Sequence, residues 1–231
     1  MLTLENVTIT QGDFQLQADF SIQAGGITAL IGPSGAGKST LLGAICGFVP
    51  LASGRVLWGD NDITHLAPAN RPMATLFQDN NLFPHLTVAQ NVGLGVRPDL
   101  RLTAQDRQIV TGAIARVGLA RWSDARASAL SGGQQSRAAL ARVLVQNRAL
   151  IMLDEPFAAL GPAMRHEMLD LVAELAREKG ATLIMVTHSP GDLERIADHA
   201  IFVAEGQAAK PEPAGALLKD PPPALKAYLG D

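Results

Sequence analysis

The stretch Gly32-Pro33-Ser34-Gly35-Ala36-Gly37-Lys38-Ser39-Thr40 decides the fold of this chain. It follows the apolar run 27–31, which predicts a buried strand, and precedes the apolar run 41–48, which predicts a helix packed on a sheet. A strand, a glycine-rich turn and a helix in this order form the setting of a phosphate-binding loop. The glycines let successive N–H groups point inward toward an anion, and the helix start adds unpaired donors.

Two side chains of this stretch add specific chemistry. Lys38 supplies a compact cation for the outer phosphates, and the Ser39 hydroxyl can ligate Mg²⁺. The alternative is a glycine turn that carries a lysine by accident, a pattern expected in roughly one chain of this length in a hundred. Because the flanking strand and helix fit as well, we interpret residues 32–40 as nucleotide contacts.

The composition bounds the class of protein. The chain has 231 residues, of which 47% are hydrophobic, enough for one large domain with a substantial core. Its net charge of −3 gives no reason to expect a nucleic-acid partner. The single cysteine, Cys46, excludes an internal disulfide, and its place in the predicted helix favours a packing role. We find no secretory signal and no apolar run near 18 residues, and therefore expect a cytosolic chain.

The first part of the chain predicts strands. Residues 2–31 contain three apolar or alternating runs, two of them separated by a turn at 11–13. A further strand at 54–58 is followed by a polar turn at 59–62, whose two aspartates are better explained as solvated turn residues than as a metal site. A small antiparallel sheet is therefore expected beside the phosphate-loop core.

The middle of the chain predicts helices. A short strand at 73–77 ends at Gln78, and Thr87 and Thr103 are candidate caps of the two helices that follow. Residues 85–130 are therefore expected to form a helical insert without strands.

The remainder alternates between helices and strands. Helices are predicted at 134–146, 162–179 and 224–229, and strands at 150–153, 182–186 and 200–203. The predicted fold class is α/β: a P-loop NTPase core with a mainly parallel sheet, an antiparallel β subdomain and an inserted α-helical subdomain. We find no internal repeat or linker, so residues 1–231 are expected to form a single domain without a C-terminal regulatory domain.

Two carboxylates end the predicted strand at 150–153. Since ligands bind beyond the carboxyl ends of parallel strands, Asp154 is expected beside the phosphate loop, where it could hold Mg²⁺ directly or through water. Glu155 points elsewhere and could accept a proton from an attacking water. A pair of acids at an ordinary strand end is the alternative.

The stretch Leu130-Ser131-Gly132-Gly133-Gln134 predicts a second anion site at a helix start. Ser131 as a simple helix cap is the alternative, but a cap alone does not require two glycines and a glutamine. Without a lysine this site would bind phosphate weakly, so we expect it to close over a nucleotide that another loop already holds.

The order of these motifs is similar to that of a known family. The phosphate loop, Gln78 after a strand, the stretch 130–134, Leu-Asp-Glu-Pro at 153–156 and His188 after a strand resemble the ATP-binding-cassette (ABC) ATPases. The resemblance covers nearly the whole chain, and the stretch 130–134 is highly specific to that family.

The resemblance implies a site shared by two copies. Each ATP would lie between the phosphate loop of one subunit and residues 130–134 of the other. Ser39, Gln78 and Asp154 would arrange Mg²⁺ and water, Glu155 would be the general base, and His188 would contact the γ-phosphate; a satisfied histidine at a strand end is the alternative for His188.

The resemblance also implies partners. A homodimer of this ATPase would associate with membrane-spanning permease subunits and a periplasmic substrate-binding protein, at the cytoplasmic face of the bacterial inner membrane. The runs 76–83 and 85–95 are most similar to the ATPases of thiamine importers, with thiamine phosphates also possible cargo. Importers of polyamine, ferric ion or an oxyanion are the alternatives.

Two positions depart from the family pattern. Position 11 is glutamine where an aromatic residue usually stacks on adenine, so Phe14 is the candidate substitute, with a core phenylalanine as the alternative. Gly161 stands where an aspartate usually touches the other subunit, which predicts weaker coupling between subunits.

Two other classes of function remain open at this stage. The first is an ABC ATPase that moves no solute, although such proteins usually carry coiled-coil arms, paired cassettes or basic extensions, which we do not find here. The second is a nucleotide-binding switch without turnover, which the position of Glu155 disfavours.

Overall fold

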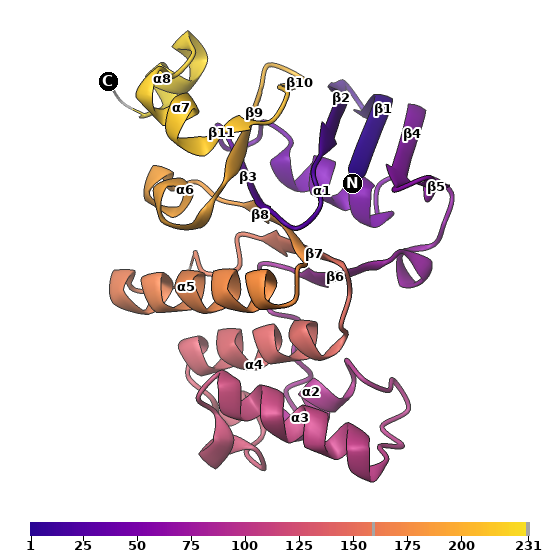
Figure 1. The fold of residues 1–231 in the computed structure, drawn as a ribbon, viewed down its shortest axis with the longest axis vertical. Helices are drawn as coiled ribbons and strands as arrows, with labels where there is room; N and C mark the ends of the chain where they lie inside the picture. Colours follow the sequence, from indigo (N-terminus) through magenta and orange to yellow (C-terminus); the bar gives the residue numbers. More distant parts are fainter. Residues whose placement is uncertain (159, 230–231) are drawn as a thin grey trace.

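A mixed sheet organises the structure, a computed structural model that describes residues 1–158 and 160–229 (Figure 1). In the described chain the strand order is β5-β4-β1-β2-β10-β9-β3-β8-β7-β6, and β11 pairs with β9. The strands are β1 Leu2–Gln11, β2 Phe14–Ile22, β3 Ile27–Ile31, β4 Ser53–Trp58, β5 Asn61–Asp62, β6 Met73–Leu76, β7 Leu150–Asp154, β8 Thr182–Val186, β9 His199–Ala204, β10 Gln207–Ala208 and β11 Glu212–Pro213. The helices are α1 Lys38–Cys46, α2 Val88–Gly93, α3 Ala104–Arg116, α4 Gly132–Val145, α5 Pro162–Glu178, α6 Pro190–Ile196, α7 Ala214–Lys219 and α8 Pro223–Leu229.

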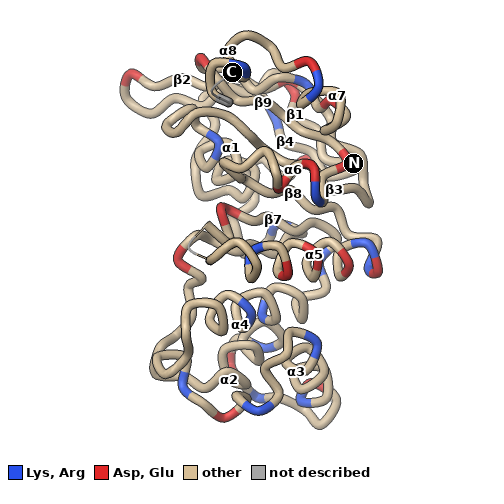
Figure 2. Tube along the Cα trace, turned by 90° about the vertical axis from the view of Figure 1, so that its left-hand side faces the viewer, with Lys and Arg blue, Asp and Glu red and all other residues tan. Residues whose placement is uncertain are grey.

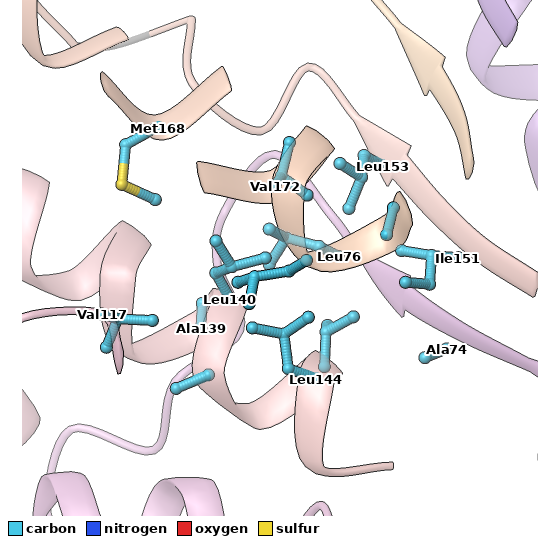
Figure 3. Packing of buried hydrophobic residues seen from close by; sticks show 14 of the residues in the cluster. Ala74, Leu76, Val117, Ala139, Leu140, Leu144, Ile151, Leu153, Met168 and Val172 are labelled. Atoms are coloured by element: carbon cyan, nitrogen blue, oxygen red, sulfur yellow. The ribbon is translucent and has the colours of Figure 1, made fainter. Parts of the chain in front are cut away.

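The parallel part of the sheet is covered on both faces. Strands β9, β3, β8, β7 and β6 run parallel, and β3 and β8 are buried along their whole length. Along β7, Leu150 and Met152 pack in the cluster that contains α1, whereas Ile151 and Leu153 pack in the cluster that contains α4 and α5. Figure 3 shows the second cluster from close by. This alternation explains why the strand reads as a continuous apolar run.

The antiparallel part of the sheet stands beside this core. β1 pairs with β2 and β4 in antiparallel register, and β10 joins β2 to β9. This confirms the expected antiparallel subdomain. The prediction that residues 59–62 form a turn was wrong in its second half. Asn61 and Asp62 form the short strand β5 and pair with Trp58 and Leu57, so the turn is confined to residues 59–60.

Three helices begin with reciprocal side-chain caps. The side chains of Thr87 and Thr103 each accept a hydrogen bond from the backbone N–H three residues further on. In turn, the side chains of Gln90 and Asp106 accept a hydrogen bond from the backbone N–H of the respective threonine. Ser131 and Gln134 do the same at the start of α4. The two threonine caps confirm the predicted starts of α2 and α3. Residues 85–130, all described, contain these two helices and 3₁₀ turns but no strand.

Several short elements were not predicted. Helices α6 and α7 and strands β10 and β11 have two to seven residues each, too few for a hydrophobic period to show. They form where tertiary packing supports them: Leu193 of α6 and Leu217 of α7 are buried against β3 and β9.

Arg71 holds the C-terminal end of α1. Arg71 is 3% exposed, and its guanidinium donates to the carbonyls of Ala44 and Ile45 in α1, and to those of Thr64 and Leu66. A cation that satisfies the last carbonyls of a helix stabilises it there. The helix that starts at the phosphate loop is therefore fixed at its far end.

We expect Cys46 to be unreactive in the folded protein. Burial raises the pKa of its thiol to about 11, and the side chain is 1% exposed. At pH 8 only about 10⁻³ of such a thiol is thiolate, the reactive form, so labelling should be at least about a hundredfold slower than in denaturant. A chromogenic disulfide reagent, with and without urea, measures this; equal rates would contradict the packing role.

Candidate functional site

A cleft of about 440 Å³ lies beyond the carboxyl ends of β3 and β7. It is lined by Ser34, Gly35, Gly37, Lys38, Ser39 and Thr40 of the phosphate loop, together with Gln11, Phe14, Gln78, Glu155 and His188. These residues come from segments spread over most of the sequence. The parallel strands bring the phosphate loop, Glu155 and His188 to one edge, whereas Gln11 and Phe14 come from the antiparallel pair β1–β2. Charges of both signs are interspersed along the described chain (Figure 2).

The loop requires glycine at two positions for different reasons. Gly32 lies against β9, and a Cβ there would stand 2.0 Å from the carbonyl oxygen of Val203. Gly37 has a φ of +98° and caps α1, and a Cβ there would stand 2.5 Å from Cζ of Phe14. The first glycine lets the loop pass close to the sheet, and the second lets it turn into the helix.

Lys38 is oriented by its own loop. It is 4% exposed, and its ammonium donates to the carbonyls of Gly32 and Pro33, each at 2.8 Å. Burial lowers the pKa of Lys38, while the charges of Glu155 and Asp154 oppose this. Lys38 lines the cleft, and no carboxylate of a described residue is bonded to its ammonium, so an anionic ligand would gain a charge-assisted contact there.

Ser39 and Asp154 form a pair of hard oxygen donors. The Ser39 hydroxyl donates to Oδ1 of Asp154 at 2.9 Å, and burial is the main cause of a raised pKa for Asp154. Gln78 follows β6 and lines the same cleft. Among the described residues no three His, Cys, Asp or Glu gather as a metal cluster. The Ser39 hydroxyl and the Asp154 carboxylate are donors that fit Mg²⁺, which commonly takes one or two carboxylates and completes its shell with water and phosphate oxygens.

Glu155 and His188 contact each other across the cleft. Nε2 of His188 and a carboxylate oxygen of Glu155 are hydrogen-bonded, and the two side chains are 35% and 17% exposed. Glu155 has a φ of +45°, an uncommon conformation for a residue other than glycine. Its N–H is bonded to the carbonyl of Val186 at the end of β8. The backbone thus turns the carboxylate away from the path of the strand and toward the histidine.

The stretch 130–134 lies outside the cleft. Ser131 caps α4, and the Gln134 side chain accepts from the Ser131 N–H at 2.9 Å, so the cap does use the glutamine, contrary to our expectation. Gly133 leaves room for Met164, because a Cβ there would stand 2.0 Å from its sulfur. Only Gly132 has open space around it, and Ser131 is exposed beside it.

The aromatic residue Phe14 lies beside the loop. Its ring approaches Gly37 and packs on the core cluster, and it lines the cleft together with Gln11. The packing of Phe14 agrees with the alternative of a core phenylalanine, and its place in the lining leaves it accessible to a ligand in the cleft. Adenine stacking by Phe14 stays a prediction.

Two contacts of the site were not predicted. Thr187 and Asp192 are hydrogen-bonded, and Arg165 of α5 donates to Asp192 at 2.5 Å, which ties the loop after β8 to two helices. Tyr228, the only tyrosine of the chain, donates to the carbonyl of His188. Neither contact could be predicted from the sequence, because the residues involved are brought together only by the fold and form no local pattern.

The family profile described as "ABC transporter" matches residues 16–158. The chain belongs to the ABC transporter family. The profile spans the phosphate loop, the stretch 130–134 and the carboxylates 154 and 155, and it thereby confirms the resemblance and the predicted fold class.

Curated relatives and solved structures agree with this assignment. The chain is 59% identical to the "Thiamine import ATP-binding protein ThiQ" of Ruegeria sp. (strain TM1040) and 56% identical to that of Cereibacter sphaeroides, over 100% of each chain. A dimeric post-hydrolysis structure of the ATP-binding cassette MJ0796 with ADP and Pi matches with a TM-score of 0.81 and 28% identity, over 93% of this chain and 99% of that one. The ADP conformation of the cassette MJ1267 matches with a TM-score of 0.86 and 28% identity, over 100% and 99%.

Proposed function

We propose that this ABC family member is the ATP-hydrolysing subunit of a thiamine importer, acting by ATP + H₂O → ADP + phosphate. The observation that carries the enzymatic part is that Lys38, Ser39 and the Glu155–His188 pair line one cleft, with Asp154 bonded to Ser39 beside it. The cargo rests on full-length relatives that are named as thiamine import ATP-binding proteins. Thiamine phosphates are further candidates for cargo.

The phosphates of ATP would be bound by the loop 32–40. Lys38 would exchange its bonds to the loop carbonyls for bonds to phosphate oxygens, and the N–H groups at the start of α1 would add donors. Phe14 is the candidate contact for adenine. Mg²⁺, held by Ser39, Asp154 and Gln78, would offset the charge of the phosphates.

Glu155 would act as the general base. Its carboxylate would accept a proton from the attacking water, and before the nucleotide binds, the hydrogen bond to His188 directs that carboxylate into the cleft. His188 would turn its Nε2 to the γ-phosphate once that group is bound. Gln78 would position the water.

The second half of each site would come from another copy. Leu130, Ser131, Gly132, Gly133 and Gln134 form a helix start that lies outside the cleft of their own chain, and Ser131 and Gly132 are exposed. ATP that contacts both subunits favours the closed dimer, and a shift from mostly open to mostly closed needs about 5.5 kcal/mol of differential binding. A few charge-assisted hydrogen bonds of roughly 1.5–3 kcal/mol each can supply this.

The partners follow from the proposed cargo. In the described residues no helix is long and apolar enough to cross a membrane. By the proposed cargo, the dimer would work with permease subunits that span the inner membrane, bound at their cytoplasmic face, and with a periplasmic thiamine-binding protein. Polyamine, ferric-ion and oxyanion importers remain alternatives, and nothing in the site favours a non-transport role.

We expect Gly161→Asp to strengthen the coupling between subunits. Gly161 caps α5 without a side-chain bond, and apart from its chain neighbours no described residue has an atom within 4 Å of a Cβ built there, so an aspartate fits and also caps the helix. The ATPase rate and its Hill coefficient should both rise. Measured rates and cooperativity equal to the wild type would contradict this role of position 161.

Reconstitution tests the proposed function. The ATPase, purified with the permease from its own organism, is placed in liposomes with the periplasmic protein loaded with thiamine, spermidine, ferric ion or sulfate. Hydrolysis and uptake should rise with thiamine alone. Stimulation by another solute reassigns the cargo, whereas absent ATPase activity in every reconstituted sample refutes the enzyme.

A further inference from the structure

His188 is held from two sides. On the cleft side its Nε2 is bonded to Glu155. On the other side the hydroxyl of Tyr228 donates to the His188 carbonyl oxygen at 2.9 Å and lies 3.5 Å from the ring atom Nδ1. The tyrosine belongs to α8, forty residues further along the chain.

Helix α8 is firmly seated next to the sheet. Leu225 is completely buried in a cluster that includes Ala29 and Ile31 of β3 and Phe202 of β9, and the Tyr228 ring packs against the same cluster. In Figure 1, α7 and α8 lie together beside β9 and β11. Because β3 leads directly into the phosphate loop, the ring of Tyr228 is fixed relative to that loop, and its hydroxyl has a defined position.

The two contacts restrict the histidine in a specific way. The bond to the carbonyl fixes the backbone of the loop that follows β8, and the hydroxyl beside Nδ1 favours the ring orientation in which Nε2 faces the cleft. Burial, and next the charge of Glu155, raise the pKa of Tyr228, so the phenol keeps its proton and remains a donor at neutral pH. A phenylalanine would fill the same space but would give neither contact.

We propose that Tyr228 is a positioning residue for hydrolysis, which acts by aiming the imidazole of His188 at the reacting end of the nucleotide. This inference rests on the proposed function, since it assigns the tail of the chain a part in the same site. The proposed role belongs to the Tyr228 hydroxyl alone. The structural role of α8 is a separate one, carried by the packing of Leu225 and of the Tyr228 ring.

A double-mutant cycle separates the two roles. Tyr228→Phe should lower kcat for ATP about five- to tenfold and leave KM and Tm unchanged, because one hydrogen bond is lost and the ring packing is kept. In a His188→Ala background the same change should have no further effect. Lys226→Ala, an exposed site on the same helix, is the control and should match the wild type.

The outcomes are distinct. A fall in both backgrounds, or none in either, overturns the proposal. The imidazole ¹⁵N shifts of His188 in the nucleotide-free chain provide a readout that does not need activity, and they should differ between wild type and Tyr228→Phe. Unchanged shifts overturn the positioning role, whereas a wild type without ATPase activity refutes the proposed function and leaves the shift test valid.

Discussion

Glu155→Gln should abolish turnover while ATP still binds. The amide keeps the shape and a hydrogen bond to His188, but it cannot accept a proton from water, and a general base contributes about 10²- to 10⁴-fold to a rate. We therefore expect kcat to fall by at least about a hundredfold. The Kd for ATP should stay within about twofold of the wild type, since the uncharged amide leaves the phosphate contacts in place. Single-turnover hydrolysis and nucleotide titration measure the two quantities.

The same variant should reveal the dimer. Because bound ATP is no longer consumed, the closed form should accumulate and elute as a dimer on size-exclusion chromatography with Mg-ATP. Glu194→Gln, an exposed position on α6, serves as the control and should behave as the wild type. Turnover by Glu155→Gln near the wild-type rate would place the base elsewhere.

Asp192→Ala should cost about 3 kcal/mol of unfolding free energy, the usual scale for removing one partner of a buried ion pair. Asp192 is 4% exposed and joins the Arg165 guanidinium to Thr187, the residue before His188. Its loss leaves Arg165 without a carboxylate, and Nε of Arg165 already has no hydrogen-bond partner among the described residues. Urea unfolding followed by circular dichroism measures the change.

The chain offers a matched comparison for this prediction. Asp170 and Arg195 form a second ion pair between α5 and α6, bonded at 2.6 and 2.7 Å, but both side chains are substantially exposed, at 55% and 35%. Asp170→Ala should therefore have little effect on stability, because water replaces the lost partner. Equal losses for the two aspartates would show that burial does not govern the Arg165–Asp192 pair.

Local patterns were enough to predict much of the fold. The apolar runs of β3, β7 and β8 gave the strands of the parallel core, and Thr87 and Thr103 marked two helix starts. These predictions were possible because a hydrophobic period or a capping pair involves only a few neighbouring residues. The short elements α6, α7, β10 and β11 carry no such period, and they exist because a neighbouring surface supports them.

In the candidate site, too, the features encoded by local patterns could be predicted and those that depend on the fold could not. Lys38, Ser39 and Glu155 could be placed in one cleft, with Asp154 bonded to Ser39 beside it, because parallel strands end at a common edge. The bond between Glu155 and His188 and the contact of Tyr228 depend on side-chain directions, including the positive φ of Glu155, and no sequence spacing encodes these. For residues 130–134 the helix cap could be recognised in the sequence because it is local. Their proposed ligand could not be placed from one chain, because it would be bound by the loop of another copy.

The place of β3 in the sheet has a consequence during protein synthesis. This strand carries the phosphate loop at its end, and in the described part of the chain it pairs in the sheet only with β8 and β9, which span residues 182–204. A nascent chain in which the loop has already been synthesised must therefore wait for the synthesis of residues 182–204 before the strand that carries the loop can pair. Such non-local pairing slows folding and prolongs the time in which apolar strands are unprotected. A truncated transcript would thus yield no weakened ATPase but an aggregation-prone fragment, a natural substrate for chaperones and proteases.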